Sequence, residues 1–306
     1  MIKILIAAAS IAAGLLASTA ARAQNELVVS QYMHNYFAVN PSFAGSRGGL
    51  SVFGSFRKQW MGIESSPMSM LLTAHTPLRR EKIAAGLSVY NQTIHESRNT
   101  GAMVSVGYRT RINRDVWLGF ALQPGVAFRS ADWTQMRTMD PDDEVFAEKH
   151  TGVAPLLGFG ASVYGEKFFA GVSTTSFFVT DDFDNVDTNF SPSEATYILC
   201  GGYWFDLNNS FALQPSLMAD YSKKTDAAAN ITLSAIWRDM AWLSVAYRTN
   251  KDLTAGLAYK PNQRFKVAYS YTLSMGDVQS YNSGSHEISL QYDFVYKVKT
   301  ISHRFF

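Results

Sequence analysis

Apolar and polar residues alternate along most of this chain, in segments of about ten residues separated by turns, as in membrane-spanning barrel strands. The clearest segment covers residues 116–128. One of its faces has Val116, Leu118, Phe120, Leu122, Val126 and Phe128, and the other has Gly119, Ala121, Gln123, Gly125 and Arg129. The first face suits lipid and the second suits a lumen. Because a bilayer offers no water to backbone N–H and C=O groups, such strands can cross it only as a closed barrel.

About fourteen segments follow this pattern, an even number that returns the chain to the side where it began. They cover residues 49–60, 68–76, 82–91, 100–112, 116–128, 153–164, 168–175, 196–205, 211–221, 230–237, 242–247, 253–259, 265–273 and 285–294. The sequence therefore predicts an all-β fold, a transmembrane antiparallel β-barrel over residues 49–294.

The connections between these segments alternate in length. Every second one is short, namely 77–81, 113–115, 165–167, 206–210, 238–240 and 260–264. The long ones belong to the opposite set, which includes 130–152, 179–194 and 274–284; the connection at 250–252 is short and breaks the trend. Bacterial barrels have short periplasmic turns and long external loops, so the short connections are expected on the periplasmic side.

Aromatic residues flank the expected periplasmic turns. The pairs are Tyr108 and Trp117, Tyr164 and Phe168, Trp204 and Phe211, Trp237 and Trp242, and Tyr259 and Phe265. Aromatic girdles mark the membrane interface of such barrels. A soluble β-sandwich would also have alternating strands, but its aromatic residues would form a core. Only 17% of the residues are charged, against about 25% in an average soluble domain, which favours the membrane barrel.

The first 23 residues have the pattern of a secretory signal peptide. Lys3 precedes an apolar run, and Ala21, Arg22 and Ala23 form a cleavage site that predicts a mature start near Gln24. We expect residues 24–48 to be a periplasmic segment and residues 295–306 to be a basic periplasmic tail. The single cysteine, Cys200, is expected to act as a small apolar residue.

The sequence contains no recognisable catalytic or cofactor motif, so we expect neither enzymatic activity nor a cofactor nor a bound metal. A net charge of +2 implies no nucleic-acid partner. Catalysis at the rim is an alternative, with His75, His95, Ser97 and Asp132 as candidates. The long loops are acidic, through Asp140, Asp142, Asp143, Glu144, Asp181, Asp182, Asp184 and Asp187. These carboxylates are able to bind calcium, but their spacing fits no known loop and favours a solvated acidic rim.

The most specific motifs lie between the signal peptide and the second expected strand. They read Gln31-Tyr32-Met33, Asn40-Pro41-Ser42-Phe43-Ala44-Gly45-Ser46, Arg57-Lys58-Gln59-Trp60-Met61-Gly62 and then Pro67. This order resembles the PorP/SprF family of the Bacteroidetes type IX secretion system, whose members carry an NPAyAGS motif followed by RxQWxG and a proline. Ser42 and Phe43 replace the commoner Ala and Tyr.

The resemblance implies a non-enzymatic outer-membrane component of the type IX secretion and gliding machinery. Its expected partners are the other components and a large secreted adhesin-like protein, engaged through its C-terminal domain for export or surface attachment, in contact with outer-membrane lipid. A passive pore for small solutes is the alternative function. An open lumen would favour the pore, and a filled lumen the secretion component.

Six residues of these motifs are expected to plug the lumen or to bind a partner: Asn40, Pro41, Gly45, Arg57, Gln59 and Trp60. Asn40 and Pro41 favour a turn, and Gly45 permits a positive φ or a close backbone approach. Bracing of the barrel and direct contact with cargo both fit this pattern. Arg57 and Gln59 are expected to point inward, where a buried charge needs a partner, for which Asp220 is a candidate.

Overall fold

The computed structural model describes residues 31–78, 81–132, 134, 149–174, 195–223, 227–275 and 283–294, and the backbone of two short strands between 178 and 190. The expected signal peptide, the C-terminal tail and the acidic loop residues lie outside these ranges. Within the described residues, no helix is long and apolar enough to cross a membrane.

Long antiparallel strands form the main sheet. They are β1 Leu50–Lys58, β2 Met68–Pro77, β3 Ile83–Ile94, β4 Ser97–Arg111, β5 Trp117–Asp132, β6 Lys149–Tyr164, β7 Phe168–Thr174, β10 Tyr197–Tyr203, β11 Phe205–Asp206, β12 Phe211–Tyr221, β13 Ala228–Trp237, β14 Ala241–Arg248, β15 Asp252–Tyr259, β16 Phe265–Ser274 and β17 Ser285–Phe294. Two further strands, β8 Phe178–Val179 and β9 Asn189–Phe190, pair with each other.

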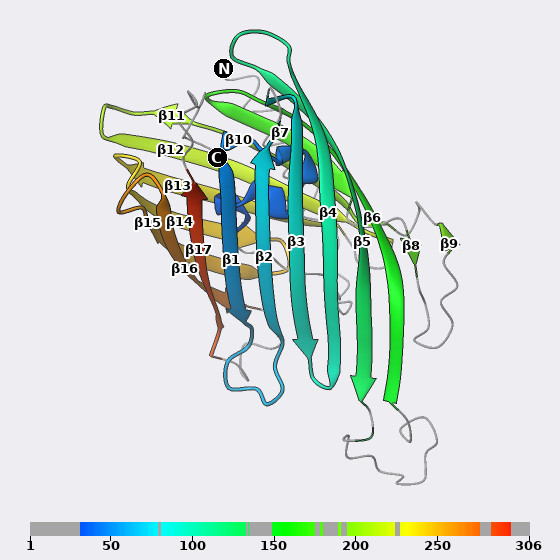
Figure 1. Ribbon diagram of the computed structural model, residues 1–306. Helices are drawn as coiled ribbons and strands as arrows, with labels where there is room; N and C mark the ends of the chain where they lie inside the picture. The colour runs from blue at the N-terminus through cyan, green and yellow to red at the C-terminus, as the bar shows by residue number, and fades with distance from the viewer. Residues whose placement is uncertain are drawn as a thin grey trace.

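The main sheet closes on itself (Figure 1). The first and last strands, β1 and β17, pair along their length, and β10 pairs with both β7 and β12. Since β10 and β11 are two parts of one spanning strand, the described residues form a closed barrel of 14 strands. The predicted fold class is therefore confirmed.

Side chains alternate between the two surfaces of the barrel wall as predicted. On β5, Phe120, Leu122 and Phe128 are exposed on the outside, while Ala121 and Gln123 are buried inside. The outward residues form the apolar surface that meets lipid, and the inward ones form a mostly small and polar lining.

Several boundaries differ from the prediction. β3 and β4 extend to a tight turn at His95 and Glu96, instead of ending near residues 91 and 100, and His95 has a φ of +55°. β5 and β6 likewise extend to Asp132 and Lys149. These extensions continue the strand pairing beyond the apolar band. Polar residues dominate them for this reason. The predicted strand at 196–205 is interrupted at Trp204, whose N–H donates to Lys167 O.

The expected aromatic girdle is partly wrong, because four of its ten residues do not face the membrane. Tyr108, Phe211, Trp237 and Tyr259 are exposed on the outside, as expected. Four residues, one from each of four pairs, face the lumen and are buried, namely Trp117, Tyr164, Trp204 and Trp242. A strand alternates its faces at every residue, so an aromatic residue near a turn points inward or outward according to its register. These four inward aromatic residues surround the segment described below.

Substitutions on the outer surface should have a cost that depends on depth. Leu122→Arg, near the middle of β5 and 55% exposed, should lower the free energy of unfolding by about 2–4 kcal/mol. Ile112→Arg, in a periplasmic turn and 61% exposed, should lower it by at most about 1 kcal/mol. Urea unfolding in lipid vesicles measures both. Equal costs for the two variants would contradict the assignment of this face to lipid.

Candidate functional site

Residues 31–48, which we call the inner segment, lie inside the barrel (Figure 1). Within this range there are three 3-10 helices of three residues each, η2 Tyr32–His34, η3 Tyr36–Ala38 and η4 Pro41–Phe43. Helices this short have few hydrogen bonds of their own, so the barrel wall must hold them. Tyr32, Asn40 and Phe43 are 0% exposed, which shows how completely the wall encloses the segment.

Polar side chains of the inner segment reach the wall on several sides. Gln31 Nε2 donates to Ser270 Oγ (3.1 Å) and to Glu287 O (3.0 Å). Tyr32 Oη lies 3.2 Å from Ser216 Oγ and 3.1 Å from Thr232 Oγ1, within hydrogen-bonding distance of both. Further bonds join Asn35 Nδ2 to Thr73 Oγ1 (2.8 Å), Gln214 Nε2 to Tyr36 Oη (2.9 Å), and Ser173 Oγ to Val39 O (2.6 Å). The contacts therefore surround the segment and fix its register against the wall.

Aromatic rings fill the space between the inner segment and the wall. The Tyr36 ring centroid lies 4.2 Å from that of Phe169 and 5.8 Å from that of Phe43. Phe43 in turn lies 5.8 Å from Tyr164. Such aromatic pairs add to the free energy gained by burial. The inward aromatic residues at the periplasmic end thus form a core with the segment instead of a membrane girdle.

Asn40 connects the inner segment to the wall. Its Oδ1 accepts from Ser42 N (3.0 Å) and Ser42 Oγ (2.7 Å), which caps η4. Its Nδ2 donates to two backbone carbonyls of neighbouring strands, Ala161 O and Val172 O, both at 3.2 Å. Pro41 follows as the first residue of η4, where its missing N–H has no intrahelical partner to lose. The Asn-Pro pair thus starts a helix and attaches it to β6 and β7.

Gly45 lies in the turn that leads out of η4. Its φ is +70°, and a Cβ added there would lie 2.9 Å from Pro77 N, so only glycine fits without strain. The Gly45 N–H donates to His75 Nδ1 (3.0 Å), and Gly45 O accepts from Arg109 Nη1. Arg109 also donates to Glu81 O, in the turn between β2 and β3. Gly45 therefore lies between the backbone of Pro77, the imidazole of His75 and the guanidinium of Arg109.

Glycines of the wall make room for the inner segment. A Cβ added at Gly119 would lie 2.8 Å from Ser42 O, and one added at Gly171 would lie 2.6 Å from Asn40 Nδ2. A Cβ at Gly160 would overlap Asn40 Oδ1. Any larger residue at these positions would displace the segment.

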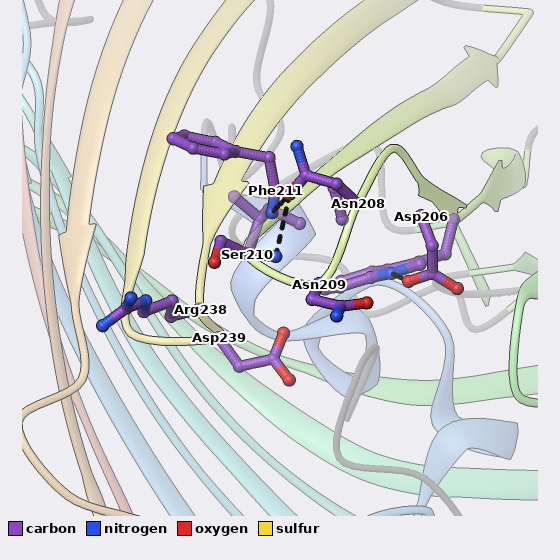
Figure 2. A pocket seen from close by; sticks show the side chains of 10 residues that line it. Asp206, Asn208, Asn209, Ser210, Phe211, Arg238 and Asp239 are labelled. Carbon is purple, nitrogen blue, oxygen red and sulfur yellow. Dashed lines mark hydrogen bonds between the residues drawn. The ribbon is translucent and has the colours of Figure 1, made fainter.

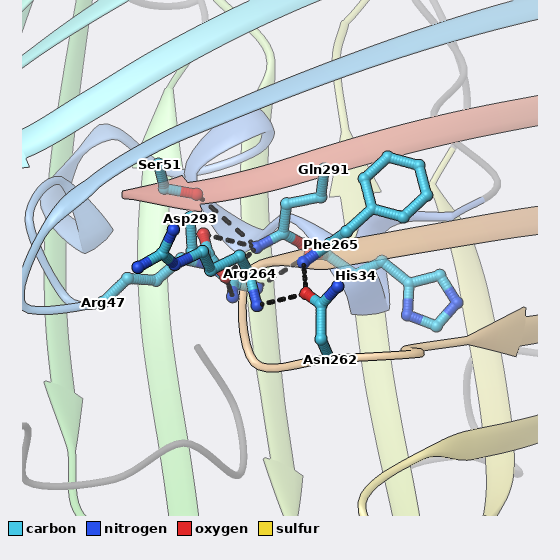
Figure 3. Close-up of polar contacts among 8 residues, drawn as sticks. All are labelled: His34, Arg47, Ser51, Asn262, Arg264, Phe265, Gln291 and Asp293. Atoms are coloured by element: carbon cyan, nitrogen blue, oxygen red, sulfur yellow. Dashed lines mark hydrogen bonds and ion pairs between the residues drawn. The ribbon is translucent and has the colours of Figure 1, made fainter. Parts of the chain in front are cut away.

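At the periplasmic mouth, the end of the barrel formed by the short turns, Arg47 closes the inner segment against β17 (Figure 3). Arg47 Nη1 lies 3.0 Å from Asp293 Oδ2, and its Nη2 donates to His34 O (3.3 Å). Gln291 Nε2 donates to both carboxylate oxygens of Asp293. Burial lowers the pKa of His34 well below its usual value, and the positive charges of Lys266 and Arg47 act in the same direction, so His34 is neutral at pH 7.

Arg57 points inward near the external end of β1, but its carboxylate partner is not Asp220. Arg57 Nη1 lies 3.2 Å from Glu287 Oε2 on the adjacent strand β17. Asp220 instead accepts from Arg248 Nη2 at 2.9 and 3.0 Å. Register explains the difference, because Arg57 and Glu287 are directly opposite each other in the β1–β17 pair. That pair forms only when the barrel closes, so sequence patterns gave no sign of it.

Gln59 and Trp60 lie beyond the end of β1, at the external end of the barrel and away from Asn40, Pro41 and Gly45. Gln59 N donates to Pro67 O (2.8 Å), which closes the loop between β1 and β2. Trp60 has a φ of +47°, and its N–H donates to Ser285 Oγ (3.1 Å). The six residues singled out from the sequence therefore divide between the two ends of the barrel.

Of the four residues considered for catalysis, three lie close together at one end of the barrel, where Asp132 N donates to Glu96 O (3.2 Å), and the fourth lies at the other end. His75 is buried beside Gly45 at the periplasmic end, whereas His95, Ser97 and Asp132 lie at the external end. Cys200 is buried on the inner face of β10. In the described part of the chain, no three His, Cys, Asp or Glu residues converge to hold a metal ion.

Comparison with family models matches residues 21–292 to "Type IX secretion system membrane protein PorP/SprF". The chain belongs to the PorP/SprF family. It is thus an outer-membrane component of the type IX secretion system, as the N-terminal motifs indicated. The match extends over the inner segment as well as almost the whole barrel.

Solved outer-membrane proteins share low identity with this PorP/SprF chain. Omp33 of Acinetobacter baumannii is 10% identical, with a TM-score of 0.47 and coverage of 80% of this chain and 98% of that one. The toluene transporter TbuX of Ralstonia pickettii is 10% identical, with a TM-score of 0.45 and coverage of 88% and 94%. No curated protein compared with the sequence gave a match.

Proposed function

We propose that this protein is a closed, non-enzymatic barrel that engages a secreted surface protein, through that protein's C-terminal domain, for export or attachment at the cell surface. The observation that carries the proposal is the inner segment. Its contacts extend around the lumen, from Thr73 on β2 through Val172 on β7 to Ser270 on β16. A lumen occupied in this way favours a docking role over a passive pore.

The structural role that we propose for Asn40, Pro41 and Gly45 is to plug and brace the barrel. Each bonds to or packs against the wall instead of presenting a free group to a partner. Asn40 is 0% exposed, so a cargo protein would have to displace the segment to reach it. Cargo recognition is therefore better assigned to another surface.

The surface that we propose for cargo is the external loop at residues 59–67. Its Met61 N–H donates to Gly284 O (2.8 Å), and Ser283 N–H donates to Met61 O (2.7 Å). Both bonds tie the loop to the segment before β17. Met61 is nevertheless 40% exposed, and Trp60 beside it is half-buried. A rigid loop that presents apolar side chains loses little conformational entropy on binding, which suits a docking surface.

An affinity capture from outer membranes of the native host tests this proposal. The tagged protein should bring down type IX components and a large secreted protein. The double variant Trp60→Ala/Met61→Ala should recover that secreted protein at least about tenfold less well, since apolar anchors dominate such interfaces. The matched control is Leu78→Ala/Ile112→Ala, which removes exposed apolar side chains at the opposite end of the barrel.

Two outcomes would contradict the proposal. Capture of the barrel alone, from membranes in which candidate cargo is expressed, would remove the docking role. Equal loss of cargo in the test and control variants would remove the external loop as the site of recognition.

A further inference from the structure

Lys58 and His286 lie next to each other on the outer surface of the barrel, at its external end. They are directly opposite each other in the pairing of β1 with β17, which places their β-carbons about 4.5–5.5 Å apart. Both alternate along their strands with residues that are buried inside. The next outward residues toward the periplasm, Phe56 and Ile288, are 37% and 48% exposed. Two basic side chains therefore adjoin the apolar surface that meets lipid.

The depth of this pair in the membrane follows from the length of the strands. β1 extends from Leu50 to Lys58 in nine residues, and a tilted strand needs about 9–11 residues to cross a bilayer. The external loop at residues 59–67 begins directly after Lys58, and Lys58 Nζ donates to Ser66 O (2.8 Å) at the base of this loop. The pair is therefore at the level of the lipid headgroups in the external leaflet.

Both side chains have donor groups that can bind an anion. A lysine ammonium carries three N–H donors, so Lys58 has further donors besides the one that bonds to Ser66 O. His286 Nδ1 lies 2.7 Å from Tyr269 Oη, and the ring centroids of His286 and Tyr271 are 5.1 Å apart, so two tyrosines orient the imidazole. A ring protonated on both nitrogens can donate from Nε2 to a ligand. Within the described residues, neither Lys58 nor His286 forms an ion pair with a carboxylate.

Other parts of the outer wall have no such pair. On β10 and on β12 to β16, no outward strand position carries a charged residue, and Tyr197 and Tyr221 are opposite each other at the external end. Among the described strands of the main sheet, the remaining outward charged side chains are Arg98, Asp132 and Lys149. These three lie in the extensions of β4, β5 and β6, beyond the apolar band. The pair on β1 and β17 is thus a local feature of the wall.

The hollow at the periplasmic mouth also lacks an excess of positive charge. It has a volume of about 790 Å³ and lies between the turn from β11 to β12 and the turn from β13 to β14 (Figure 2). Its charged lining residues are Asp206, Arg238 and Asp239, and Lys167 Nζ pairs with Asp206 Oδ2 at 3.0 Å. Charges of both signs meet there, so this hollow does not select an anion.

We propose that Lys58 and His286, oriented by Ser66 O and the two tyrosines, bind a phosphate group of a phosphorylated glycolipid in the external leaflet. A lysine ammonium binds phosphate as a point charge, and a bond to an ionised group is stronger than a neutral one. The acyl chains of the same lipid would lie along Phe56, Ile288 and the apolar residues below them. The external leaflet of a Gram-negative outer membrane consists mainly of such a glycolipid, lipopolysaccharide, whereas phospholipids are mainly in the periplasmic leaflet. The position of the pair therefore favours the glycolipid.

The test is native mass spectrometry of the purified full chain in a non-ionic detergent, with diphosphorylated lipid A as the probe. The variant Lys58→Gln/His286→Gln should retain at least about tenfold less lipid A than the unmodified chain, because two charge-assisted hydrogen bonds are lost. Lys58→Arg, which keeps the charge, should bind normally. The matched control, Lys223→Gln/Lys251→Gln, removes two cations from exposed positions in other external loops and should also bind normally. If the double variant does not fold, His286→Gln alone should still lower retention about threefold.

Equal retention of lipid A by the test and control variants would overturn the proposal. Equal binding of lipid A from which the phosphate groups have been removed would also overturn it. Displacement of lipid A by an equal concentration of phosphatidylglycerol would assign the site to phospholipid, with the same consequence. Lipid binding in detergent is measured without cargo. Failure of the lipid site would therefore leave the proposed function standing, and loss of cargo capture would leave the lipid site standing.

Discussion

Deletion of residues 31–46 should turn a closed barrel into a conducting pore. The segment fills the lumen at its periplasmic end, and the wall that it covers has small polar residues such as Thr73, Ser216, Thr232 and Ser270, which can bond to water instead. Barrels of somewhat more strands leave aqueous channels, so current in planar bilayers should rise at least about tenfold over the full chain.

A variant of full length gives a control for this deletion. In Gly160→Leu, the added side chain would occupy the position of Asn40 and push the inner segment out of place while the rest of the chain is retained. Partial conductance is the expected result. Both proteins should first be shown to fold, by their heat-dependent migration on gels. If both proteins are folded and neither conducts, the inner segment does not control the passage of ions through the barrel.

Replacing Asn40 by aspartate should destabilise the protein more than replacing it by alanine. Asn40→Ala loses the cap of η4 and leaves two wall carbonyls without their donor, which should cost about 2–4 kcal/mol of unfolding free energy. Asn40→Asp keeps the capping acceptor, but its carboxylate would face Ala161 O and Val172 O, which repel it. The reverse order is expected at an ordinary helix cap, where aspartate is a good substitute.

Urea unfolding of the two variants measures this difference, with Asn35→Ala as the control. Asn35 donates one hydrogen bond to Thr73 Oγ1, so its loss should cost only about 1 kcal/mol. A stable Asn40→Asp variant would show that the two carbonyl contacts contribute little, and that Asn40 acts as a local cap alone.

The sequence determined the barrel because its physical cause is local. Apolar and polar residues alternate along a strand whose two faces meet different surroundings, and the side of each connection follows from its length. The fourteen strands were therefore predictable to within a few residues. The turn at Asn40-Pro41 was also predictable, since asparagine and proline favour turns, whereas Gln59-Trp60 was recognised only by the resemblance to the PorP/SprF family. Alternation did not reveal which aromatic residues face inward near the turns, because there the register rather than the composition decides.

Only the tertiary structure decided where the inner segment lies and what holds it. Gln31 meets Ser270 and Asn40 meets Val172, over separations of 239 and 132 residues, and no local pattern encodes such contacts. The same holds for Arg57 and Glu287, which meet because the first and last strands close the barrel. Closure of the barrel forms the lumen and brings together residues that are far apart in the sequence. The sequence alone thus predicted strands with an apolar and a polar face. Closure of the barrel decided which residues the polar face contacts.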